Sequence, residues 1–92
     1  MYQIQPYTYS QALKLGVKIT PSKKPLKKLD VFDFNGNYIC SIGALGYNDY
    51  PTYLKTKNKA YADERRRLYK IRHQHNLHKK GSAGYYSNNL LW

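Results

Sequence analysis

The sequence predicts a small α+β domain, in which one β-hairpin packs with a long basic C-terminal helix and two short helices. Strand-forming residues flank an Asn-Gly pair at 29–34 and 38–42, and a basic segment with helical spacing of apolar residues covers 59–78. A chain of 92 residues suits one domain, which buries only about 60–65% of the surface its unfolded chain exposes. We therefore expect a single domain over 1–92 with a small core.

The N-terminal third is expected to contain little regular structure. Residues 1–8 predict an extended arm. Ser10 is suited to cap a short helix over 11–15, which Gly16 would end. Residues 21–28 hold two prolines and four lysines and predict a basic loop, either a solvated linker or a flexible cationic contact strip.

The hairpin is the clearest element, because Asn35-Gly36 is a residue pair that favours tight hairpin turns. An isolated two-stranded ribbon is marginally stable, so it must lie on a helix or gain strands from a partner. The Gly-rich segment 43–51 then predicts a loop, and its spacing does not match a phosphate-binding loop. Asp49 as cap and Pro51 in the first turn predict a short helix up to Leu54.

The long helix is predicted over 59–78, because Tyr61, Leu68, Ile71 and His75 recur at helical spacing. Gly81 would end this region, and Ser82 would cap a last short helix over 83–91. The expected core residues are Val31, Ile39, Leu68, Ile71, Leu90 and Trp92.

Composition indicates a polyanionic or acidic partner. Sixteen Lys and Arg stand against five Asp and Glu, which gives a net charge of +11. So much charge on a small body is self-repulsive, and a nucleic acid, an acidic protein surface or an anionic membrane face would relieve it. The eleven tyrosines suit both a core and an interaction surface. We expect no signal peptide and no transmembrane segment, because no apolar run approaches about 20 residues.

No catalytic or metal site is predicted, and no cofactor is expected. Cys40 is alone in an apolar run, where a buried structural thiol is the default. His73, His75 and His78 lack a fourth ligand and are flanked by cations, which disfavours zinc.

An enzyme is likewise not expected. The acidic residues fit local ion pairs and caps rather than a catalytic pair. A set resembling a tyrosine recombinase site could be assembled from Arg65, Arg72, His73 and Tyr85, but the chain is too short for the DNA-wrapping body that this chemistry needs.

The candidate site is therefore a surface that binds a polyanion or a partner. Its residues come from the basic helix and the basic loop: Arg65, Arg66, Arg67, Lys70, Arg72, His73, Lys23, Lys24, Lys27 and Lys28. These side chains could neutralise phosphates while tyrosines stack on bases. They could equally bind carboxylates of an acidic protein face.

Four blocks in order resemble a family of small basic proteins encoded by giant DNA viruses of the phycodnavirus and mimivirus kind. The blocks are Tyr9-x-Gln11-Ala12-x-x-Leu15-Gly16-Val17, Ser41-Ile42-Gly43-Ala44-x-Gly46-Tyr47-x-Asp49-Tyr50-Pro51, Glu64-Arg65-Arg66-x-x-Tyr69-x-x-Arg72-His73 and Gly81-Ser82-Ala83-Gly84-Tyr85-Tyr86-Ser87-x-x-Leu90-Leu91-Trp92.

The resemblance implies a virus particle as the setting, with synthesis in the host cytoplasm or virus factory. The expected function is a non-enzymatic minor capsid or cement protein, part of a larger assembly, that bridges acidic capsid subunits through the basic helix and a tyrosine-rich surface. The alternative is a small nucleic-acid-binding protein that acts on DNA or RNA in packaging or regulation.

Overall fold

The computed structural model describes residues 2–75 and 77–92 and has the predicted α+β class. Its elements are α1 (Pro6–Leu15), β1 (Lys18–Pro21), β2 (Lys27–Phe32), β3 (Tyr38–Ala44), α2 (Tyr50–Thr56), α3 (Lys59–Arg72) and α4 (Ala83–Leu91). The strands form one antiparallel sheet in the order β1-β2-β3. The basic helix is α3, and it is followed by the expected short helix over 83–91, α4, so a long basic helix at the C-terminus is not confirmed.

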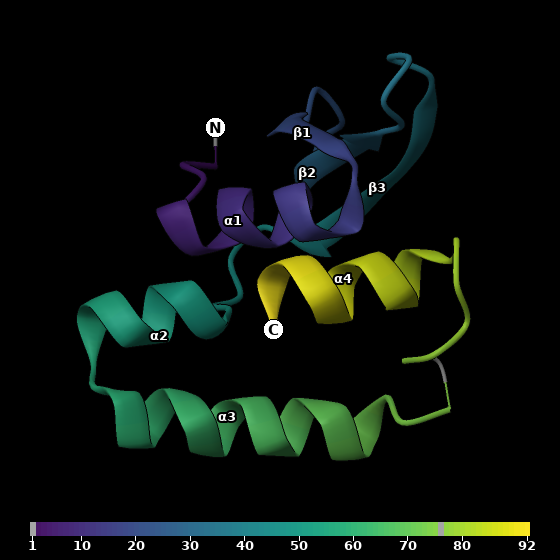
Figure 1. Ribbon diagram of the computed structural model, residues 1–92. Helices are drawn as coiled ribbons and strands as arrows, with labels where there is room; N and C mark the ends of the chain where they lie inside the picture. The colour runs from purple at the N-terminus through teal and green to yellow at the C-terminus, as the bar shows by residue number, and fades with distance from the viewer. Residues whose placement is uncertain (1, 76) are drawn as a thin grey trace.

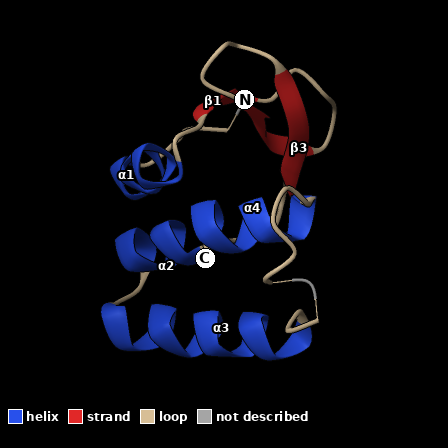
Figure 2. Ribbon diagram, turned by 45° about the vertical axis from the view of Figure 1, so that its right-hand side comes forward, coloured by secondary structure: helices blue, strands red, loops and turns tan. Residues whose placement is uncertain are grey.

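Helix α4 forms the middle of the molecule (Figure 1). The sheet and α1 lie on one side of it, and α3 lies on the other side (Figure 2). Because α4 contacts elements on both sides, its apolar residues can close a core that the hairpin alone could not.

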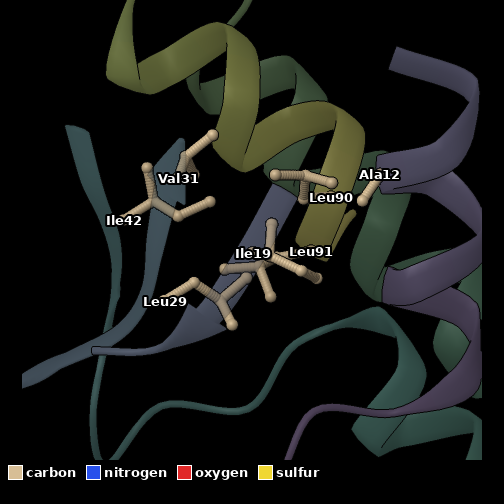
Figure 3. Packing of buried hydrophobic residues seen from close by; sticks show 7 residues of the cluster. All are labelled: Ala12, Ile19, Leu29, Val31, Ile42, Leu90 and Leu91. Atoms are coloured by element: carbon tan, nitrogen blue, oxygen red, sulfur yellow. The ribbon is translucent and has the colours of Figure 1, made fainter. Parts of the chain in front are cut away.

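The main core lies between the sheet and α4. Its side chains converge from three elements of the sheet and from α1 and α4 (Figure 3): Ala12, Ile19, Leu29, Val31, Ile42, Leu90 and Leu91. Alternation along β2 directs Leu29 and Val31 to the same face, and both are fully buried. The predicted core positions Val31 and Leu90 are confirmed, while Ile39 and Trp92 are partly buried at the edge of this cluster.

The predicted hairpin is confirmed, with β2 paired to β3 across the turn at Asn35-Gly36. The expected basic loop over 21–28 is shorter than predicted. Pro21 ends β1, an edge strand where its missing N–H group is tolerated, and Lys27 and Lys28 already belong to β2.

The first helix begins earlier than predicted. Pro6 occupies the first turn of α1, where its fixed φ angle suits a helix start, and Gln5 is the N-cap. Ser10 is therefore inside the helix and does not cap it, and the expected arm over 1–8 is reduced in the described chain to residues 2–5. The prediction that Gly16 ends the helix is confirmed.

Two helix caps are confirmed, and one helix end is not. The side chain of Asp49 accepts a hydrogen bond from the Thr52 N–H, and that of Ser82 accepts one from the Tyr85 N–H. Helix α3 ends at Arg72, so the predicted continuation to residue 78 was wrong; Asn76 lies outside the described residues. Most helical stability in proteins comes from packing of an apolar face. Leu77 is buried in a turn beyond α3, so its burial does not depend on a longer helix.

The predicted core face of α3 was also wrong. Leu68 and Ile71 are 36% and 53% exposed, whereas Ala62 is fully buried. Tyr69 stacks on Trp92 from the face that packs on the rest of the protein. Bulky aromatic rings therefore fill the space beside α4, and the aliphatic stripe faces outward.

Candidate anion-binding cleft

A cleft of about 480 Å³ lies between α3, the C-terminal end of α4 and the loop that follows β3. Residues from five separate parts of the sequence line it, among them Lys27, Tyr47, Arg65, Arg72 and Trp92. The volume falls within the range of roughly 300–1,000 Å³ that is typical of ligand sites. The cleft is therefore large enough to hold part of a ligand rather than a single ion.

One face of α3 forms the basic wall of the cleft. Arg65, Tyr69, Arg72 and His73 line it. They are spaced by four, three and one residues, so they project from the same side of the helix. Asn58 caps this helix by accepting a hydrogen bond from the Tyr61 N–H at 2.8 Å, which stabilises the start of the rod that carries these side chains.

Aromatic rings form the floor. The Tyr69 and Trp92 rings are stacked, with centroids 4.5 Å apart and planes 8° apart, and the His73 ring centroid lies 4.4 Å from that of Tyr69. Tyr53 contacts Trp92 at a centroid distance of 6.3 Å. These contacts restrict the rotamers of the four rings, all of which line the cleft beside its cations.

The cleft carries an excess of positive charge. Its lining includes no Asp or Glu among the described residues. Within residues 2–75 and 77–92, no carboxylate forms an ion pair with Lys27, Arg65 or Arg72. In contrast, Lys28 is neutralised by Asp49 at 2.9 Å. Converging uncompensated cations favour an anionic ligand.

Three other cations of α3 are engaged within the protein. The Arg66 guanidinium stacks 3.5 Å above the Tyr50 ring, and Arg67 forms a two-pronged ion pair with Glu64. Lys70 donates a hydrogen bond to Asn88 Oδ1 at 2.7 Å. Burial, with a contribution from nearby Arg66, lowers the pKa of Lys70. Arg66, Arg67 and Lys70 therefore contribute less to the cleft than their place in the sequence indicates.

The predicted lysines of the basic loop likewise differ in whether they are exposed or engaged within the protein. Lys23, Lys24 and Lys27 are exposed, whereas Lys28 is buried in its ion pair. Lys24 donates a hydrogen bond to the Tyr38 hydroxyl at 2.8 Å. Of these four residues, Lys27 and Lys28 line the cleft, and only Lys27 offers it an unpaired charge within the described chain.

Tyr47, Tyr69 and Trp92 are parts of this site that the sequence did not assign to it. Tyr69 and Tyr61 of the basic helix were expected to stack on bases if the partner is a nucleic acid, but neither was included among the site residues, and Trp92 was assigned to the core. Tyr47 follows the two glycines of the segment 43–51 and is 75% exposed. An aromatic residue in a glycine-rich loop is a signal of exposure that could have identified it.

The described residues contain no group of three or more His, Cys, Asp or Glu side chains able to hold a metal ion. Across the same part of the chain, no helix has the length and apolar character needed to cross a membrane.

Comparisons of the chain with protein-family models, with curated proteins and with solved structures find no match.

Proposed function

We propose that the protein is a non-enzymatic nucleic-acid-binding protein, which holds a strand through the cleft between α3 and the loop after β3. The observation that carries this proposal is the combination of Lys27, Arg65 and Arg72 with an aromatic floor in one cleft that lacks carboxylates among the described residues. Lysine and arginine neutralise phosphates and release counterions, which supplies most of the affinity of non-specific nucleic-acid binding.

Two features favour phosphates with bases over the carboxylates of an acidic protein. Tyr69 and Trp92 line the cleft beside its cations, and aromatic rings bind bases by stacking. In addition, only four of the eleven tyrosines, Tyr9, Tyr38, Tyr47 and Tyr61, are exposed, so most of the tyrosine content is explained by packing. The case for a broad tyrosine-rich contact surface is correspondingly weaker.

The test is a salt titration of binding to a fluorescent oligonucleotide of about 20 nucleotides. We expect sub-micromolar affinity at about 0.15 M salt and a steep linear fall of log affinity with log salt. Trp92 is the only tryptophan and lines the cleft, so its fluorescence should change on binding. This signal reports occupancy of the cleft independently of the labelled ligand.

A charge-matched pair of double variants locates the binding site. Lys27→Ala/Arg72→Ala removes two cleft cations, and Lys14→Ala/Lys55→Ala removes two exposed cations that do not line the cleft. The cleft variant should bind at least about tenfold more weakly, with a salt slope lower by about 1 to 2. Equal losses in both variants would show that general charge, not the cleft, is responsible. Absence of binding at physiological salt would disprove the function.

A second candidate is a structural component of a virus particle, a minor capsid or cement protein. It is supported by the resemblance to giant-virus proteins and by the outward face of α3, where Tyr61, Leu68 and Ile71 are 43%, 36% and 53% exposed. Exposed apolar side chains on one helix face are suited to contact another protein.

Cross-linking and mass spectrometry of purified virus particles test this candidate. The chain should be present and cross-linked to a capsid subunit, and Leu68→Ser/Ile71→Ser should reduce its incorporation without impairing oligonucleotide binding. Absence of the chain from the particles would remove this candidate and leave the nucleic-acid proposal intact.

A further inference from the structure

Leu26 has an unusual backbone conformation. Its φ angle is +67°, and among the described residues it is the only one besides glycines with a positive φ. It follows Pro25 in the turn between β1 and β2, which a hydrogen bond from the Lys27 N–H to the Lys24 carbonyl closes at 3.4 Å. The left-handed conformation costs a residue with a Cβ atom on the order of 1–2 kcal/mol, and glycine would avoid this cost.

Nothing in the described protein compensates for that cost through packing, because the Leu26 side chain is 74% exposed. The turn closed by the Lys27 N–H, with Pro25 at its second position, requires a positive φ angle at its third residue, where glycine is usual; the turn therefore explains the conformation of residue 26 but not the presence of a leucine side chain there. The strain therefore directs attention to what the Leu26 side chain contacts outside the protein.

Leu26 belongs to an apolar rim beside the cleft. The Leu26 carbonyl accepts a hydrogen bond from the Leu45 N–H at 2.9 Å, which joins the two turns. Leu45 is 38% exposed, and Tyr47, two residues further on, is 75% exposed and lines the cleft. We refer to Leu26, Leu45 and Tyr47 as the apolar rim. Lys27 follows Leu26 directly and also lines the cleft, so the rim adjoins the cleft through Lys27 and Tyr47.

Cations accompany the rim. Lys23, Lys24 and Lys27 are all exposed within a few residues of Leu26. Asp30 is an acidic residue close to this turn, but it is only 6% exposed, and its oxygens accept hydrogen bonds from Ser22, Ser41 and the Lys23 N–H. The apolar rim, with cations around it, complements a partner that has apolar faces between negative charges.

We propose that the apolar rim contacts unpaired bases of a nucleic-acid strand while the cleft binds its phosphates, so that the protein prefers single-stranded over double-stranded nucleic acid. This inference rests on the proposed function and specifies its substrate class. Base faces are accessible in a single strand and hidden by stacking in a duplex. The concave cleft next to the rim suits a narrow strand better than a flat membrane surface.

The experiment compares the affinities for a single strand and for its duplex at equal salt, in the wild type and in Leu26→Gly. The wild type should bind the single strand at least about tenfold more tightly. Leu26→Gly removes the side chain but accepts the positive φ angle, so its stability should be equal or higher. Its affinity for the single strand should be at least about fivefold lower, while its affinity for the duplex should change by less than about twofold.

Leu13→Ala is the matched control, because Leu13 is 81% exposed on α1 and outside the rim. It should leave both affinities unchanged. A 2-aminopurine base in the single strand adds a direct readout, since its fluorescence should change when the wild type binds and change less with Leu26→Gly.

Three results would overturn the inference. The first is an unchanged single-strand affinity in Leu26→Gly while Lys27→Ala/Arg72→Ala loses binding, which leaves the proposed function standing. The second is an equal loss for both nucleic-acid forms. The third is binding of the wild type to anionic lipid vesicles, lost in Leu26→Gly, with no binding to either oligonucleotide; this would reject the proposed function as well.

Discussion

The ammonium nitrogen of Lys28 lies 2.9 Å from Oδ2 of Asp49, and both side chains are at most 5% exposed. The pair joins β2 to the N-cap of α2. Asp49 also accepts hydrogen bonds from the Tyr2 hydroxyl at 2.6 Å and the Thr52 N–H at 3.0 Å. One carboxylate thus connects the N-terminal segment, the sheet and the helix that precedes α3, so it helps to hold the two walls of the cleft in place.

The two partners of this pair should not be equally costly to replace. Asp49→Asn leaves a buried ammonium whose other described contact is the Tyr2 ring, at 5.2 Å, and should cost about 3–5 kcal/mol in the free energy of unfolding. Lys28→Met leaves a carboxylate that retains two donors and should cost less. Urea unfolding measures both values. A larger loss for Lys28→Met would contradict this account of the pair.

Acid should destabilise the protein below about pH 4. Burial opposes ionisation of Asp49, but hydrogen bonds from Lys28, Tyr2 and Thr52 outweigh it, so the pKa of Asp49 lies below its ordinary value of 3.8. A carboxyl group with a lowered pKa in the folded state stabilises the fold above its unfolded pKa, and this contribution is lost as the pH falls through the folded pKa.

The other four carboxyl groups also have lowered pKa values in the folded protein: Asp30, Asp33, Asp63 and Glu64. The urea midpoint, measured from neutral pH downward, should therefore fall steeply below about pH 4, and the fall should be smaller in Asp49→Asn. Identical pH profiles for the two proteins would show that Asp49 does not contribute.

Substitution of Gly43 by alanine is expected to destabilise the protein more than the same substitution at Gly36, although both glycines have a positive φ angle. The φ angle of Gly43 is +78°, and an added Cβ would lie 2.8 Å from Leu91 Cδ1 in the core. Gly43→Ala should cost about 2–4 kcal/mol from strain and overpacking together. Gly36 has a φ angle of +87° with open space around it, so Gly36→Ala should cost only about 1–2 kcal/mol. Thermal or urea unfolding of the two variants checks the difference.

Arg66 and Arg72 should separate stability from binding. Arg66→Ala removes the cation above the Tyr50 ring and should lower the free energy of unfolding by about 1–3 kcal/mol. Arg72 is exposed at the cleft, so Arg72→Ala should change stability by less than about 0.5 kcal/mol and weaken oligonucleotide binding. Paired unfolding and binding measurements decide, and the reverse pattern would show that the cleft has been assigned to the wrong arginine.

Interactions between near neighbours were predictable from the sequence. The Asn35-Gly36 turn and the caps at Asp49 and Ser82 are found as expected. Each depends on residues within about four positions, where the chain geometry allows few alternatives. The excess of positive charge is equally a property of the sequence alone, and it indicated an anionic partner before any cation had been placed.

The tertiary structure alone decided which cations are engaged within the protein. Arg66 and Lys28 resemble Arg72 and Lys27 in the sequence, yet each of the first two is engaged by a residue distant from it along the chain. The same applies to α3, whose aliphatic stripe faces outward because the aromatic rings of Tyr69 and Trp92 occupy the space beside α4. Contacts between remote residues depend on how whole elements pack, and local periodicity carries no information about which partner will lie opposite.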